Sequence, residues 1–274
     1  MVKTTIELEH HHVERSEEAA AYIASLSGLS KTKAKDAMKK GAVWLDSGKG
    51  SKRLRRASAQ LVPGSKLSLY YSENILNTEP PTATIIDDAS AYSVWNKPAG
   101  LMSGGSRYGD HCAINRVVEK QLDRPTFLVH RLDRFVWGVM LLAHSKKAAT
   151  ELSRQFQSRE TEKTYKALVH GLIKEEQTID LPVEGKVALS SITPLSRSEH
   201  HTLVEVAIET GRKHQIRQHL SAIGHPIVGD RQHSSADPNG IQLASVALGF
   251  KNLEGKFVRY ELPEELHPKL LNEC

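Results

Sequence analysis

Two short segments combine acidic, basic and imidazole side chains at spacings that suit chemistry. In residues 130–133 (His-Arg-Leu-Asp), a carboxylate stands beside an arginine at the start of an apolar run. An ionised carboxylate at the edge of a buried element is costly unless a cation and hydrogen bonds compensate it. In residues 211–217 (Gly-Arg-Lys-His-Gln-Ile-Arg), His214 and Arg217 are three positions apart, on one helix face. Arg217 could therefore supply the cation that Asp133 needs.

The same side chains also allow a purely structural interpretation. His130 and Asp133 could form an interior hydrogen-bond pair, and the arginines could belong to a solvated helix face. A metal-dependent or His-Asp hydrolase is a weaker hypothesis, because the sequence contains no H-E-x-x-H, G-x-S-x-G or P-loop pattern.

The elements that must position these segments alternate between strand and helix patterns from residue 91 onward. The predicted strands are 91–96, 136–143, 164–169 and 201–209, and the predicted helices are 146–159 and 213–223. Mixed elements of this kind predict an α/β or α+β domain. The first segment then precedes a buried strand, and the second opens a helix.

Charge is distributed unevenly along the chain of 274 residues, whose formal net charge is +5. Residues 31–66 hold 11 basic and two acidic residues, a net charge of +9, so the remainder carries −4. A block of this kind is typical of a surface that meets phosphates, although a solvated lysine-rich helix is the alternative. The 39% hydrophobic content supplies a sizeable core and excludes a disordered tail or a small disulfide scaffold.

The basic block lies in a predicted small domain. Helices are expected at 16–27 and 31–40, with Ser30 as N-cap of the second, followed by a strand at 42–46. Residues 29–46 (LSKTKAKDAMKKGAVWLD) resemble the S-four-like RNA-binding domain, in which a two-helix unit presents basic residues to structured RNA. The candidate RNA-binding residues of this block are Lys31, Lys33, Lys35, Lys39, Lys40, Lys52, Arg53, Arg55 and Arg56.

Four further segments, in order, resemble the motifs of the RluA-type pseudouridine synthases. They are VWNKPAGL (94–101), HRLD (130–133), KTYKALVHG (163–171) and TGRKHQIRQHLSAIGHPIVGD (210–230). The resemblance covers about residues 92–250. It predicts an α+β catalytic domain with a mixed, largely antiparallel sheet. The expected organisation is an RNA-binding domain at 1–73, a linker at 74–88 and the catalytic domain at 89–274.

The resemblance implies that uridine in structured RNA is isomerised to pseudouridine without a cofactor or a metal. It assigns the catalytic aspartate to Asp133, the arginine paired with it to Arg217 and the tyrosine under the base to Tyr165. Arg131 matches the residue that enters the RNA stack when the uridine is flipped out. The remaining motif positions, which phosphate contacts or local scaffolding would also explain, are Lys97, His130, Lys163 and His214.

Three departures from the family pattern motivate an alternative function. Val136-Trp137-Gly138 replaces a usual Thr-Ser-Gly step, Met102-Ser103 replaces a His-Pro pair, and Leu243-Ala244-Ser245 replaces a Leu-His-Ala. We expect an active enzyme on ribosomal RNA first and transfer RNA second. The alternative is a non-catalytic RNA-binding or ribosome-assembly protein that keeps the fold.

The expected location is cytoplasmic, with RNA as the partner and neither a membrane nor an obligate protein partner indicated. The longest apolar run, 135–143, is shorter than the roughly 18 residues that a membrane helix needs. Cys112 and Cys274 form no C-x-x-C pair and are expected to be reduced thiols. The histidine run 10–12 is interpreted as an exposed strand or a cloning remnant.

Overall fold

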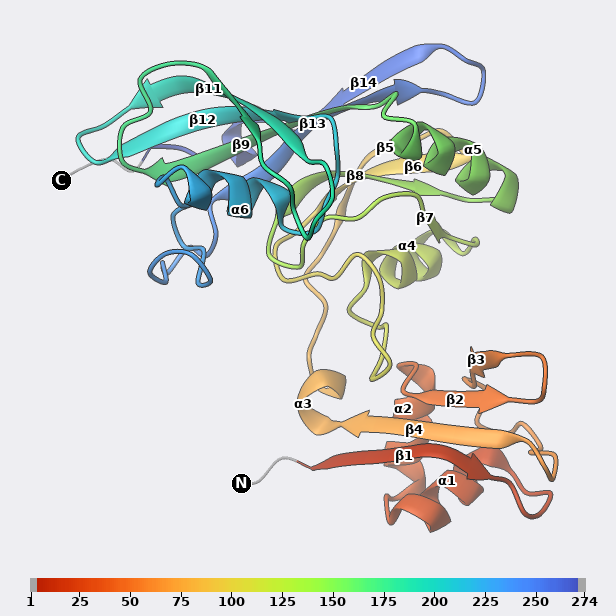
Figure 1. Cartoon of the computed structure of the whole chain (residues 1–274). Helices are drawn as coiled ribbons and strands as arrows, with labels where there is room; N and C mark the ends of the chain where they lie inside the picture. Colours follow the sequence, from red (N-terminus) through yellow and green to blue (C-terminus); the bar gives the residue numbers. More distant parts are fainter. Residues whose placement is uncertain (1–3, 271–274) are drawn as a thin grey trace. The chain divides into compact units, whose positions relative to one another are not determined.

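The computed structural model describes residues 4–270, which form two compact units. The first unit contains residues up to 80 together with 104–117, and the second contains 81–103 together with the chain from 118 onward. Both are drawn in Figure 1. The first unit is therefore not one continuous segment, which differs from the expected boundary at residue 73.

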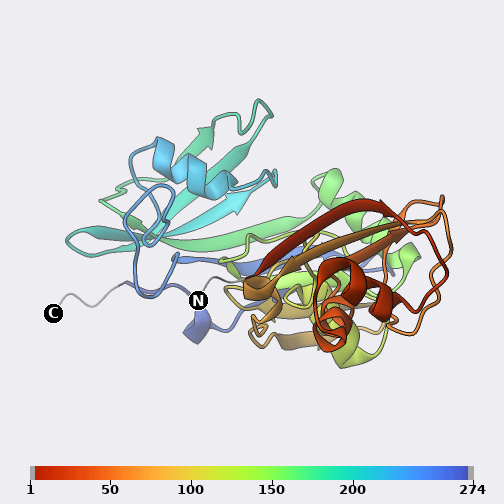
Figure 2. The same ribbon diagram turned by 90° about the horizontal axis from the view of Figure 1, so that it is seen from below.

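The first unit is a four-stranded antiparallel sheet covered by two helices. The chain order is β1 (Thr5–His12), α1 (Ala19–Ser27), α2 (Lys31–Lys39), β2 (Val43–Asp46), β3 (Ser51–Arg53), β4 (Lys66–Ser72) and α3 (Glu73–Leu76), with sheet order β1-β4-β2-β3. Figure 1 and Figure 2 show α1 and α2 on one face of this sheet. The predicted helices and the 42–46 strand are confirmed to within a few residues, and the run 10–12 lies in β1.

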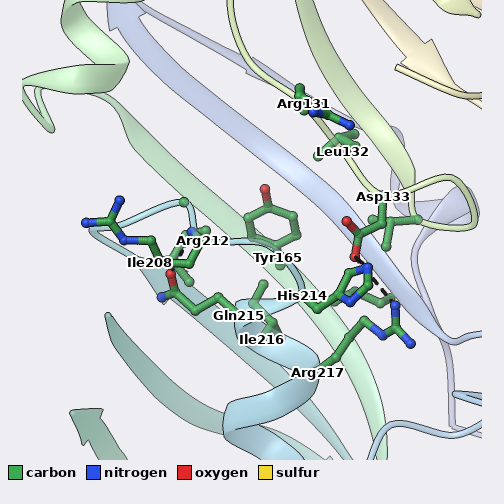
Figure 3. Close-up of a pocket in the computed structure, with 13 residues that line it drawn as sticks. Arg131, Leu132, Asp133, Tyr165, Ile208, Arg212, His214, Gln215, Ile216 and Arg217 are labelled. Carbon is green, nitrogen blue, oxygen red and sulfur yellow. Dashed lines mark hydrogen bonds and ion pairs between the residues drawn. The ribbon is translucent and has the colours of Figure 1, made fainter. Parts of the chain in front are cut away.

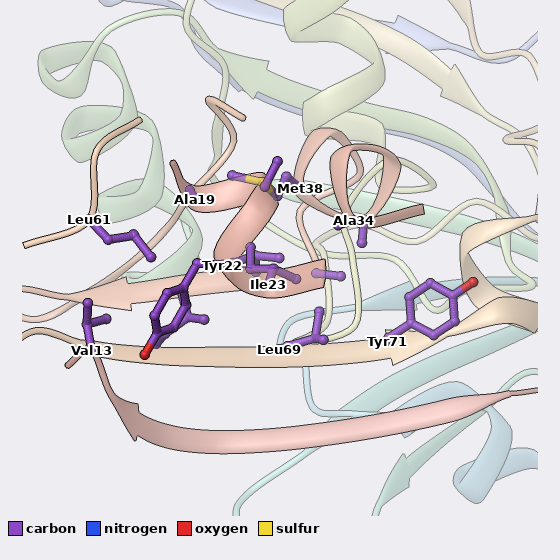
Figure 4. Packing of buried hydrophobic residues seen from close by; sticks show 14 of the residues in the cluster. Val13, Ala19, Tyr22, Ile23, Ala34, Met38, Leu61, Leu69 and Tyr71 are labelled. Carbon is purple, nitrogen blue, oxygen red and sulfur yellow. The ribbon is translucent and has the colours of Figure 1, made fainter. Parts of the chain in front are cut away.

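Apolar side chains from both helices and from β4 form the core of this unit (Figure 4). Ala34, Ala37 and Met38 form the inward face of α2 and are fully buried, as their spacing predicts. Ser30 caps the helix, since its Oγ accepts a hydrogen bond from the Lys33 backbone nitrogen at 3.2 Å. The lysines of α2 are thereby left on the solvent side.

Residues 104–117 join this unit through contacts that sequence alone did not indicate. Asp110 pairs with Arg55 and, at 3.3 Å, with Arg53. The indole nitrogen of Trp44 donates to the Arg107 carbonyl at 3.0 Å. A carboxylate far along the chain therefore neutralises part of the basic block.

The second unit is built on one large, mostly antiparallel sheet. Its strands are β5 (Thr84–Asp88), β6 (Tyr92–Lys97), β8 (Trp137–Ala143), β9 (Glu162–His170), β10 (Gln177–Asp180), β11 (Leu189–Arg197), β12 (His201–Ile208) and β13 (Leu243–Lys251), in the order β10-β11-β12-β9-β13-β8-β6-β5. β7 (Phe127–Leu128) pairs with β8, and β14 (Phe257–Glu261) pairs with β13. The predicted α+β class is confirmed.

The helices that accompany this sheet are α5 (Lys146–Gln157), α6 (Gln215–Ala222) and the short 3-10 turn η1 (Glu264–Leu266), while α4 (Ile114–Leu122) begins in the first unit and ends in the second. Figure 1 and Figure 2 show α6 against the part of the sheet that holds β9 and β12. Within residues 4–270, no helix is long and apolar enough to cross a bilayer.

The expected linker at 74–88 differs from the structure over much of its length. α3 occupies its beginning, and β5 pairs antiparallel with β6 at its end. The Pro- and Thr-containing stretch between them suggested a linker because an edge strand such as β5 has no strong pattern of its own. Its pairing partner, which lies in the next strand, decides its conformation.

One close backbone approach fixes the strand that follows the first chemical segment. β8 and β13 run parallel, with Gly138 opposite Ser245. The φ angle of Gly138 is +114°, and an added Cβ would lie 2.1 Å from the Ser245 carbonyl oxygen. Only glycine fits here, so the start of β8 is held tightly against β13.

Candidate active site

The two chemical segments meet in one pocket beside the central strands β9 and β13 of the large sheet (Figure 3). Asp133 comes from the turn before β8, Tyr165 comes from β9, and His214 and Arg217 come from the start of α6. The lining residues are Arg131, Leu132, Asp133, Val136, Tyr165, Ile208, Gly211, Arg212, His214, Gln215, Ile216, Arg217 and Leu243. Three of the four predicted motifs thus contribute side chains to one site.

Asp133 has two cationic or potentially cationic neighbours. Its Oδ2 atom lies 3.7 Å from Arg217 Nη1 and 3.7 Å from His214 Nε2. The Asp133 side chain is 28% exposed, so it can reach a bound molecule, whereas Arg217 is 12% exposed. The predicted proximity of Asp133 and Arg217 is present, and an arginine can hold a carboxylate with directed donors in a way that lysine cannot.

Arg217 has a tighter partner that the sequence did not reveal. Its Nε and Nη2 atoms donate to Asp230 at 2.8 and 2.6 Å, and Nη2 also donates to Gln232 Oε1 at 2.8 Å. Burial alone would raise the pKa of Asp230, but the hydrogen bonds from Arg217 hold it below its ordinary value. Asp230 ends the long motif 210–230, so its acidic type at the close of that motif was the available signal.

Tyr165 stands beside Asp133 and is buried. Burial raises the pKa of its phenol, and the negative charge of Asp133 adds to the effect, while a hydrogen bond with Ser245 opposes it. The phenol is therefore neutral at physiological pH. It can pack under a planar base, and its hydroxyl can exchange hydrogen bonds with that base.

His214 begins α6 with a left-handed backbone, at a φ angle of +56°. A left-handed backbone at a residue other than glycine costs free energy, and residues with this conformation are frequent at functional sites. Gln215, which follows it, is buried and fixes the turn through hydrogen bonds from Thr210 Oγ1 (2.7 Å) and the Arg212 nitrogen (3.1 Å) to its Oε1. The backbone before α6 is therefore held so that His214 and Arg217 face the pocket.

Lys97 is fully buried beneath the turn that carries Asp133. Its ammonium donates to the carbonyls of Leu101 (2.7 Å), Pro98 (3.1 Å) and Arg134 (3.2 Å). Burial lowers its pKa to about 7, although the charge of Asp133 acts in the opposite direction. The structure favours the scaffolding interpretation of Lys97 over a phosphate contact, because the side chain has no exposed surface.

His130 does not form the interior pair with Asp133 that the sequence left open. Its Nε2 accepts a hydrogen bond from the Leu141 nitrogen at 2.9 Å, and its ring stacks on Phe156 with centroids 4.5 Å apart. Burial lowers its pKa to about 3, and Lys163 acts in the same direction. His130 is therefore a neutral residue that contacts both β8 and α5.

The departures from the family pattern differ in where they lie relative to the pocket. Val136 lines it, and Ser245 forms a hydrogen bond with Tyr165. The indole nitrogen of Trp137 donates to the Leu266 carbonyl at 2.9 Å, in η1, and Trp137 does not line the pocket. Ser103, a second residue that sequence reasoning missed, binds Leu132 twice. Its Oγ donates to the Leu132 carbonyl at 2.6 Å and accepts from the Leu132 nitrogen at 2.9 Å. The residue before Asp133 is therefore fixed by a buried hydroxyl.

The structure places the candidate RNA-binding residues in two groups. Five of them form ion pairs: Lys31 with Glu18, Lys33 with Glu73, Lys40 with Asp36, and both Arg53 and Arg55 with Asp110. Four are exposed and make no ion pair with another residue of the described chain: Lys35, Lys39, Lys52 and Arg56. The second group is the better placed to meet phosphates, and Arg131 is exposed at the rim of the pocket.

Comparison with known proteins agrees with this geometry. The family described as RNA pseudouridylate synthase matches residues 91–222. An uncharacterized RNA pseudouridine synthase of Aquifex aeolicus is 33% identical to this chain, and the match covers 86% of each protein. The chain belongs to the RNA pseudouridine synthase family. It is therefore an isomerase that converts uridine in RNA to pseudouridine.

Three further comparisons cover less of this chain. The tRNA pseudouridine synthase C of Vibrio cholerae is 32% identical, over 53% of this chain and 71% of its own length. The ribosomal large subunit pseudouridine synthase D of Pseudomonas aeruginosa is 37% identical, over 50% of this chain and 49% of its own length. The solved structure of human RNA pseudouridylate synthase domain containing 4 is 25% identical with a TM-score of 0.56, over 66% of this chain and 89% of its own.

Proposed function

We propose that Asp133 is the catalytic nucleophile of this synthase, that Arg217 orients it and that Tyr165 packs under the target base. The observation that carries this assignment is the single pocket that Asp133, Tyr165 and Arg217 share (Figure 3). Exposed Arg131 at the rim is placed to enter the RNA stack when the uridine leaves it.

The reaction rearranges bonds within one nucleotide. The bond between ribose C1′ and uracil N1 breaks, the base turns within the site, C1′ bonds to C5, and the proton on C5 moves to N1 of the released ring edge. The atoms of substrate and product are the same, so no co-substrate is consumed. A carboxylate nucleophile can hold the intermediate while a closed pocket keeps the base from escaping.

We propose structured RNA as the substrate, with ribosomal RNA as the first candidate and transfer RNA as the second. The relatives named above include one synthase for each class. The exposed Lys35, Lys39, Lys52 and Arg56 support an RNA contact outside the pocket. A comparison of pseudouridine positions in cells with and without the protein would identify the uridine.

The experiment that tests the assignment is the replacement Asp133→Asn. The matched control is Asp180→Asn, at an exposed position at the end of β10. Asp133→Asn should abolish pseudouridine formation while RNA affinity and the unfolding midpoint stay near wild type. The control should leave all three unchanged. Turnover retained in Asp133→Asn would show that another residue is the nucleophile.

A further inference from the structure

A second hollow of about 610 Å³ opens beside the catalytic pocket in the same unit. It lies between α5, β9 and the end of β12. Five residues line both spaces: Arg131, Tyr165, Ile208, Gly211 and Arg212. In Figure 3 the Arg212 side chain lies on the opposite side of Tyr165 from Asp133 and Arg217. A polymer that leaves the catalytic pocket on this side enters the hollow directly.

Positive charge dominates the walls of this hollow. Four cationic residues line it, namely Arg131, Arg159, Lys163 and Arg212, against the single carboxylate of Glu209. Within residues 4–270, none of the four lies within ion-pair distance of a carboxylate, whereas Arg154 on the neighbouring helix pairs with both Glu151 and Glu160. These cations are therefore available to an anionic ligand.

Lys163 is half-buried in the wall of the hollow. Its ammonium donates to the Glu209 carbonyl at 3.0 Å. Burial and the nearby Arg159 lower its pKa to about 8, with Glu209 opposing. A cation that is partly desolvated and close to a second cation gains more from an anion than a fully hydrated one does.

Part of the lining is aromatic and aliphatic. Phe156 stacks on neutral His130 with an interplanar angle of 9°, and Leu128 and Ile208 continue the surface. Flat apolar walls suit a ribose or a base, and neighbouring arginine and lysine suit a phosphate. The two kinds of surface together match one nucleotide.

We propose that this hollow binds the nucleotide next to the target uridine, with its phosphate at Arg159 and Lys163 and its ribose or base against Phe156. This inference rests on the proposed function, because it takes RNA as the substrate. It assigns to Arg159 and Lys163 a part in substrate binding rather than in the chemical step.

The double variant Lys163→Met/Arg159→Gln tests the proposal. The matched control is Lys166→Met/Arg154→Gln, in which Lys166 lies on β9, like Lys163, and Arg154 lies on α5. Lys166 contacts His267 Nδ1 at 3.2 Å and does not line the hollow. The probe is a synthetic stem-loop RNA with one uridine in its loop. The test variant should raise Kd and KM about tenfold or more and change kcat less than threefold. It should flatten the slope of log Kd against log salt by about 0.7 to 0.9, the change expected for one phosphate.

A chemical change in the RNA separates a direct contact from a general loss of charge. A neutral methylphosphonate is placed in turn on the 5′ and the 3′ side of the uridine. One of the two positions should weaken wild-type binding and should cause no further loss in the test variant. Equal losses in both proteins at both positions would overturn the proposal, as would an unchanged Kd in the test variant.

These binding measurements need no turnover. If the wild-type protein bound the stem-loop through the hollow but never formed pseudouridine from any RNA, the proposed catalytic assignment would fail while the hollow would stand.

Discussion

The guanidinium of Arg217 donates two hydrogen bonds to the buried carboxylate of Asp230, and its third nitrogen, Nη1, lies 3.7 Å from Asp133 Oδ2. Asp230 is only 1% exposed, and it follows α6 in the chain. The proposed nucleophile is thus positioned by a cation that is itself positioned by a second carboxylate. This relay explains how one arginine can face the pocket in a fixed geometry.

Asp230→Asn should therefore damage catalysis more than RNA binding. The amide keeps the shape but removes the charge and one acceptor, so Arg217 can turn away from Asp133. We expect kcat to fall roughly 10²-fold, as small misplacements of catalytic groups do, with KM within a few-fold of wild type. Single-turnover kinetics on the folded protein, with Asp180→Asn as the control, measures this.

Arg217→Lys provides an independent check of the same relay. A single ammonium cannot contact Asp230 and Asp133 with the fork geometry of arginine, so kcat should fall to a similar extent. Wild-type turnover in either variant would show that the contact between Arg217 and Asp230 is not needed.

Ser103→Ala should loosen the turn that carries Asp133. The buried nitrogen and carbonyl of Leu132 would both lose their partner, at a cost of about 1–3 kcal/mol of stability. We expect kcat to fall and KM to stay nearly constant, and Ser103→Thr, which keeps the hydroxyl, should restore much of the rate. Ser158→Ala, at the exposed end of α5, is the control. A loss of stability with unchanged kcat would restrict Ser103 to a structural role.

Lys97 should make stability depend on pH in a defined direction. Its pKa is about 7 in the folded protein and 10.5 in the unfolded chain, so the unfolded state binds more protons between these values. Its contribution to the free energy of unfolding is therefore fully present above pH 10.5 and is lost as the pH falls to 7, with a slope of at most about 1.4 kcal/mol per pH unit. Denaturant unfolding of wild type and Lys97→Met at several pH values from about 7 to 10 measures this. The free energy of unfolding of wild type should increase relative to that of Lys97→Met as the pH rises. A difference that does not change with pH would contradict this expectation.

The exposed cations of the first unit should set much of the salt dependence of RNA binding. Replacing Lys35, Lys39, Lys52 and Arg56 with glutamine should flatten the slope of log Kd against log salt by about 0.7 to 0.9 for each phosphate that the variant no longer neutralises. Lys146→Gln/Lys147→Gln, in the first turn of α5, is the control. An unchanged slope would place the RNA surface elsewhere.

Local pattern was sufficient for much of the fold, and the resemblance of the motifs led to the proposed site. Apolar spacing and the Ser30 cap predicted α2, and the apolar run predicted β8. The resemblance to the pseudouridine synthases implied the roles proposed for Asp133, Tyr165 and Arg217, which line one pocket. The helix and the strand depend on neighbours within a few positions of the chain, where side-chain periodicity and capping operate.

Only the tertiary structure decided which partners the residues in and near the site contact. Asp230 holds Arg217, Ser103 holds Leu132, Trp137 turns to Leu266 rather than into the pocket, and Asp110 pairs with Arg53. Each contact joins a side chain to a side chain or backbone group elsewhere in the chain, and strand register and loop packing bring the two together. Periodicity specifies which face a residue occupies, but the residue it meets across that face depends on how distant elements pair.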